Sequence, residues 1–227
     1  MRELTLHQLN RLSDKPYFSV KDPVSALTHL VGFIAAIFLT PVLLGKASVD
    51  EKSLFEMGAL SVFMLSMIVL YGASTCHHSF VLPTRPARVL RKLDHISIFL
   101  LIAGSYTPVC VISLAAHNGL RLLLIVYLIM IVGIIFKALW INCPKWVSSI
   151  IYIAMGWMVV FNIHNIYLTL GAGFWLLLAG GVFYTIGGVI YALKFSINED
   201  WGCHEIFHIF ILLGSLCHYL TMFLFVA

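Results

Sequence analysis

Two histidines stand four residues apart at the start of the last apolar segment, in the run His204-Glu-Ile-Phe-His208. Four residues are about one helical turn, so both imidazoles project from the same face of a helix. A third histidine, His78, closes an earlier apolar segment, and an acid, Asp94, opens the next one. Three imidazoles leave the fourth position of a tetrahedral zinc ion open to water. The pattern therefore predicts a zinc site, and with it the chemistry of an activated water.

Two further side chains complete this hypothesis. Asp94 is expected to accept a proton from the water or to orient it, and Ser74, one turn before His78, is expected to hydrogen-bond a ligand or a substrate oxygen. Both also have ordinary explanations. Asp94 could pair with Arg91 or Lys92 at the membrane interface, and Ser74 could be a small packing residue.

The remaining histidines are expected to have other roles. His218 follows His208 by ten residues, about 15 Å along a helix, which is too far for the same metal. We expect it to pair with another buried polar group. His29 lies near the start of the first apolar segment, and its role stays open. Interface or outer-side positions are expected for His77, His95, His117 and His164.

Composition excludes a soluble protein. The chain has 227 residues, of which 61% are hydrophobic and 11% charged, and its mean hydropathy is +0.98. The five cysteines show no paired spacing, so free thiols are expected. The net charge of +4 does not suggest a nucleic-acid partner, because loop positions explain the basic residues. The polar N-terminus lacks the short apolar core of a signal peptide.

Seven apolar stretches are each near the ~20 residues that a bilayer requires, and their backbones must form helices in lipid. We therefore predict an all-α, polytopic membrane protein with a seven-transmembrane-helix bundle. Residues 1–21 form a polar segment, with a short surface helix containing Leu4, Leu6, Leu9 and Leu12, and residues 22–227 form the membrane domain. The predicted helices are 24–44, 55–79, 95–115, 120–140, 146–168, 173–195 and 204–226.

Basic residues predict the orientation. Eleven of the 14 Lys and Arg residues fall on the N-terminal side of the membrane, and only Lys46, Lys52 and Arg121 fall on the other. Cytoplasmic loops carry such an excess, so the N-terminus is predicted to be cytoplasmic and the C-terminus outside. This topology places the three histidines and Asp94 on the cytoplasmic side, where three helices could converge on one metal.

At these residues the chain resembles the hemolysin III family, the bacterial branch of the progestin and adipoQ receptor family. The resemblance implies a seven-helix bundle with a cytoplasmic-side zinc bound by His78, His204 and His208, and an Asp94 that contacts a zinc-bound water. It also implies an amide-hydrolase activity, since the wider superfamily includes ceramidase-like membrane hydrolases. The matching runs are Asp22-Pro-Val-Ser-Ala-Leu-Thr-His29, Ser74-Thr-Cys-His-His78, Leu93-Asp-His95, Ala103-Gly-Ser-Tyr-Thr-Pro108 and His204-Glu-Ile-Phe-His208 through His218.

The leading hypothesis is a zinc-dependent hydrolase of lipid amides or esters in the bacterial cell membrane, acting in lipid homeostasis. A membrane lipid is then the expected substrate or ligand. The alternative is a non-enzymatic, zinc-stabilised sensor or receptor. The family is named for haemolysis, but this sequence shows no feature of a secreted, pore-forming toxin. A metal or proton transporter is disfavoured because the fourth to sixth apolar stretches carry almost no ionisable groups at mid-depth.

Overall fold

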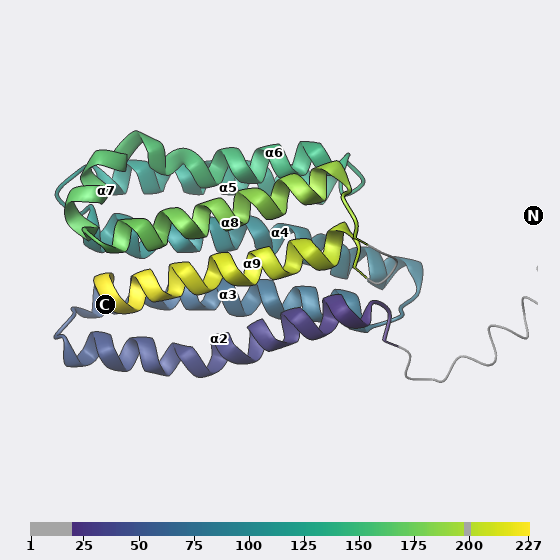
Figure 1. Ribbon diagram of the computed structural model, residues 1–227, viewed down its shortest axis with the longest axis horizontal. Helices are drawn as coiled ribbons and strands as arrows, with labels where there is room; N and C mark the ends of the chain where they lie inside the picture. The colour runs from purple at the N-terminus through teal and green to yellow at the C-terminus, as the bar shows by residue number, and fades with distance from the viewer. Residues whose placement is uncertain (1–19, 198–200) are drawn as a thin grey trace, which may run out of the picture.

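The computed structural model describes residues 20–197 and 201–227, and this part of the chain is helical throughout apart from turns (Figure 1). It contains seven helical segments long and apolar enough to cross a membrane, which confirms the predicted class. The elements are α2 (Pro23–Val49), α3 (Leu54–Ser79), α4 (Thr84–Pro108) with the π-helical segment η1 (Val109–Ser113), α5 (Gly119–Leu139), α6 (Lys145–Gly156), the 3₁₀ segment η2 (Trp157–Asn162), α7 (Ile163–Leu170), α8 (Gly173–Leu193), and α9 (Cys203–Thr221) with the π-helical segment η3 (Met222–Val226). The surface helix predicted within residues 1–21 lies almost wholly outside the described residues.

Two predicted boundaries need correction. Helix α4 begins at Thr84 and not at residue 95, because its first turns are helical but cationic, with Arg85, Arg88 and Arg91. A hydropathy pattern detects only the part of a helix that lipid surrounds. The fifth span, predicted as one helix over 146–168, is divided into α6, η2 and α7.

The helices pack as one antiparallel bundle. Helix α3 lies between α2 and α4, α8 packs against both α6 and α9, and α9 returns to contact α2 (Figure 1). Large side chains such as Phe63, Tyr71 and Phe99 fill the interior, while Phe38, Leu65 and Phe161 are exposed on the outside. An apolar exterior of this kind is the surface that lipid chains cover.

The site lies where α2 and α9 begin. Helices α2 and α9 begin at the same end of the bundle, where α3 also ends, and the C-terminus lies at the opposite end (Figure 1). The last turn of α3, the first turns of α4 and α9, and the start of α2 therefore share one end, which we call the N-terminal end. Which face of the membrane this end occupies stays a prediction.

Candidate metal centre

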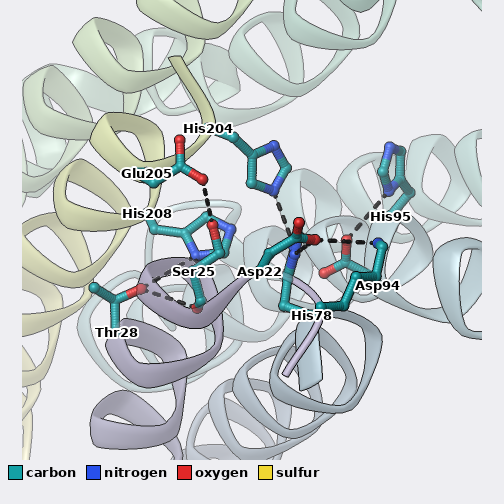
Figure 2. Close-up of polar contacts among 10 residues, drawn as sticks. Asp22, Ser25, Thr28, His78, Asp94, His95, His204, Glu205 and His208 are labelled. Carbon is teal, nitrogen blue, oxygen red and sulfur yellow. Dashed lines mark hydrogen bonds and ion pairs between the residues drawn. The ribbon is translucent and has the colours of Figure 1, made fainter. Parts of the chain in front are cut away.

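Three imidazoles meet at the N-terminal end of the bundle. His78 lies in the last turn of α3, and His204 and His208 lie in the first two turns of α9. One ring nitrogen of each lies within 4.8 Å of the others, so the group could hold a metal ion. The structure thus brings together the trio that the spacing predicted, across 126 residues of sequence between His78 and His204 (Figure 2).

The facing nitrogens have the spacing of a metal site. The Nε2 atoms of His78 and His204 lie 3.0 Å apart. A tetrahedral ion with bonds of about 2.0–2.1 Å to nitrogen would hold two ligand atoms about 3.3 Å apart. Two imidazole nitrogens this close either share a proton or coordinate one cation. The buried ring of His208 lies beside both others, with ring-centre separations of 4.6 Å to His204 and 5.1 Å to His78.

The outward-facing nitrogens of two imidazoles are held by the start of α2. The Nδ1 atom of His78 lies 2.9 Å from Oδ2 of Asp22, and the Nδ1 atom of His208 lies 3.2 Å from the carbonyl oxygen of Ser25 (Figure 2). Both partners are acceptors, so each Nδ1 carries the proton and each Nε2 keeps its lone pair. Ligand histidines in metal sites are oriented by such second partners.

Backbone and side chain together fix Asp22. Its N–H donates to the carbonyl of His78 at 2.9 Å, so the residue binds the end of α3 at two points. Burial raises the pKa of the Asp22 carboxyl, but hydrogen bonds from His78 and Lys21 outweigh that effect, and the pKa lies below its usual value. At neutral pH Asp22 is therefore an ionised carboxylate, and it accepts the hydrogen bond from Nδ1 of His78.

A second set of contacts joins α2 to α9. The hydroxyl of Ser25 donates to Oε1 of Glu205 at 2.8 Å, and the hydroxyl of Thr28 donates to the Ser25 carbonyl at 3.0 Å and lies 3.3 Å from Nδ1 of His208. The ring of His29 stacks on that of His208, with centres 3.5 Å apart. Helix α2 thus supports the site although none of its residues belongs to the trio.

Asp94 lies beside the trio. Its side chain is buried, and its carboxylate lies within 4.8 Å of ring nitrogens of His77 and His78. The ordinary explanation of an interface ion pair does not hold: its one ion pair among the described residues is with His95, at 3.4 Å. Arg91 donates instead to Asn142, and Lys92 to the carbonyl of Ala138.

Ser74 lies one turn before His78, as expected, and is almost fully buried at 1% exposure. Its hydroxyl has no hydrogen-bond partner within the described ranges, and it lines a cavity of about 150 Å³. The walls of this cavity are mainly apolar side chains of α4, α6, α8 and α9, among them Ile98, Leu101 and Ile211, and Asp94 and His208 also line it.

Three further histidines lie away from the trio. His218 was expected to pair with a polar group, yet neither of its ring nitrogens has a hydrogen-bond partner in residues 20–197 and 201–227. His117 and His164 are exposed and lie in segments at the far end of the bundle, as expected.

Sequence reasoning left the roles of Asp22, Ser25, Thr28 and His29 open. Their spacing carried a signal, since residues 22, 25 and 29 repeat at three and four positions and so share one helix face. Which other helix that face contacts depends on the packing of the bundle.

The fold and the site define a multi-pass membrane protein with a candidate metal centre at one end of its helix bundle. Residues 18–219 match the model of the family described as "Haemolysin-III related", and the chain belongs to that family.

Relatives extend the comparison over most of the chain. The chain is 37% identical over 200 residues to Hemolysin-3 of Bacillus cereus, covering 87% of this chain and 88% of that protein. It is 34% identical to the Hemolysin-3 homolog of Bacillus subtilis (strain 168), covering 87% and 91%. It is also 27% identical over 218 residues to the adiponectin receptor protein of Drosophila melanogaster, covering 85% of this chain and 48% of that one. A bacterial membrane fits the two Bacillus relatives.

Proposed function

We propose that the protein is a zinc-dependent hydrolase of amide or ester bonds in membrane lipids. One observation carries the proposal. Within the described ranges, every buried side-chain nitrogen or oxygen without a hydrogen-bond partner belongs to His29, Ser74, His95 or His218, and all four residues line the same cavity. Of these, only His95 has an ion pair among the described residues, with Asp94. Buried polar groups are normally paired, so unpaired ones that gather around one apolar cavity indicate a missing ligand.

The donor set supports zinc as the cofactor. Neutral imidazoles are common zinc ligands, and a set of three leaves one position open. The Nδ1 protons of His78 and His208 are oriented by Asp22 and Ser25. When bound, zinc would supply a Lewis acid and lower the pKa of a bound water, so that hydroxide forms at neutral pH. His78, His204 and His208 would hold the ion.

Residues of the chain would then transfer the proton and bind the substrate. The carboxylate of Asp94 takes the proton that the attacking water loses and returns it to the leaving amine or alcohol. Water adds to the acyl carbon, the C–N or C–O bond breaks, and a carboxylic acid and an amine or alcohol result. Ser74, whose hydroxyl is unpaired, donates a hydrogen bond to the carbonyl oxygen of the substrate. The apolar walls hold the acyl chain.

The test is the substitution Asp94→Asn. Asn preserves the size of the side chain but cannot accept the proton, so zinc content and folding should persist while lipid hydrolysis falls by roughly 10²–10⁴-fold. The matched control is Asp50→Asn, an exposed acid after the far end of α2 that pairs with Lys46. A screen of long-chain N-acyl lipids and lipid esters measures turnover. Hydrolysis that is unaffected by Asp94→Asn would refute the role of this residue.

A second candidate function is a zinc-stabilised membrane sensor without turnover. The observation that favours it is the match to a protein named an adiponectin receptor, together with contacts that join α2, α3 and α9 through the trio. The same screen separates the two. A sensor gives no wild-type turnover on any lipid, and loss of zinc should then alter only its stability and its signalling.

A further inference from the structure

The cavity has a second polar group far from the metal centre. His218 lies in the last turn of α9, is only 8% exposed, and lines the same cavity as His204 and His208. Ten residues of helix separate it from His208, which is about 15 Å. The backbone of Leu177 in α8 is near enough to interact with the imidazole, but neither ring nitrogen reaches hydrogen-bond geometry with any described residue.

The surrounding side chains fix the position of the His218 ring but give its nitrogens no hydrogen-bond partner among the described residues. The ring packs on Gly180 so closely that a Cβ there would lie 2.2 Å from Cδ2 of His218. The ring of Tyr184 also packs against it, with the two ring centres 5.1 Å apart and the ring planes at 75° to each other. The hydroxyl of Tyr184 is already bonded to Ser215 at 2.9 Å, and Tyr71 donates to the same serine at 2.7 Å.

An imidazole in this position is costly unless something pairs with it. Unpaired polar groups in an apolar interior lose the hydrogen bonds that water would give them, and ionisable residues within membrane helices usually mark functional sites. Apart from the Tyr184 hydroxyl, which is already bonded to Ser215, this end of the cavity is lined by apolar side chains, among them Phe174, Leu177 and Leu178. A plain hydrocarbon chain could fill the space but could not pair with the ring.

We propose that His218 forms a second subsite, which recognises a hydroxyl group in the middle of the acyl chain of the lipid. The subsite rests on the proposed function, because it requires that the acyl chain runs from the metal centre into the cavity. A neutral imidazole has one donor and one acceptor nitrogen, and a hydroxyl is both donor and acceptor, so the two match whichever nitrogen carries the proton. The helix rise places that hydroxyl about 15 Å from the reacting carbonyl.

Ricinoleic acid and oleic acid provide a direct test, because they differ only in one mid-chain hydroxyl. Binding of each labelled acid to the purified, detergent-solubilised protein should show a preference for ricinoleic acid of roughly three- to tenfold, the range of one added hydrogen bond. The substitution His218→Phe should abolish this preference while oleic acid still binds. His218→Gln, which keeps a donor and an acceptor, should retain part of it.

The control is His164→Phe, the same change at an exposed site, which should leave the preference intact. Retained zinc content shows that each variant is folded. Equal binding of both acids by wild type, or a preference that survives in His218→Phe, would overturn the subsite alone. Failure of wild type to bind either acid would overturn the acyl-chain cavity, and with it both this subsite and the proposed lipid substrate.

Discussion

The contact between Asp22 and His78 offers a quantitative test of how α2 supports the metal centre. The substitution Asp22→Asn keeps an acceptor near Nδ1 of His78 but removes its charge, and Asp22→Ala removes the acceptor. Losing the second partner of a ligand histidine typically lowers metal affinity by about 10–100-fold, which corresponds to ~1.4–2.7 kcal/mol. The Asp22 side chain is 39% exposed, so water can replace part of the lost hydrogen bond. We therefore expect about tenfold weaker zinc binding for Asn and a larger loss for Ala.

Competition between the purified protein and a zinc chelator of known affinity measures this change. The control is again Asp50→Asn, whose carboxylate pairs with Lys46 beyond the far end of α2 and contacts no histidine of the trio. It should bind zinc as wild type does. Wild-type zinc affinity in both Asp22 variants would refute the reasoning, because the 2.9 Å contact would then contribute nothing to the orientation of His78.

Two other predictions concern topology and packing. A reporter fused after Ala227 should report the outer face of the membrane, because the basic residues gather at the N-terminal end and the spans are seven; a cytoplasmic signal there would reverse the proposed side of the metal centre. The substitution Gly133→Ala should destabilise the protein by about 1–3 kcal/mol in thermal or denaturant unfolding, since its Cβ would lie 2.2 Å from the ring of Phe99. Gly58→Ala, which meets nothing within 4 Å, should not, and equal effects of the two would contradict the packing of α4 on α5.

The sequence predicted the bundle because its signals are local. The composition of each apolar stretch by itself predicts a membrane span. The spacing of His204 and His208, four residues apart, predicts that both lie on one helix face. The sequence predicts too late a start for α4, because the charges of Arg85 and Arg88 give its first helical turn the composition of a loop.

The site was predicted only in part, for a different reason. The trio could be inferred because an even number of spans, four, separates the end of α3 from the start of α9 and so brings both to one end of the bundle. The contacts of Asp22 and Ser25 depend on how α2 is rotated against α3 and α9, which no local pattern encodes. The same holds for His218, whose surroundings are set by Gly180 and Tyr184 on another helix.

The most direct test of the central claim is a structure of the purified protein with anomalous scattering recorded on both sides of the zinc absorption edge. The account predicts one zinc peak bonded to the Nε2 atoms of His78, His204 and His208 at about 2.0–2.1 Å. The peak should be lost when any one of the three is replaced by alanine. A peak bound elsewhere, a metal other than zinc, or full zinc occupancy in all three alanine variants would contradict it.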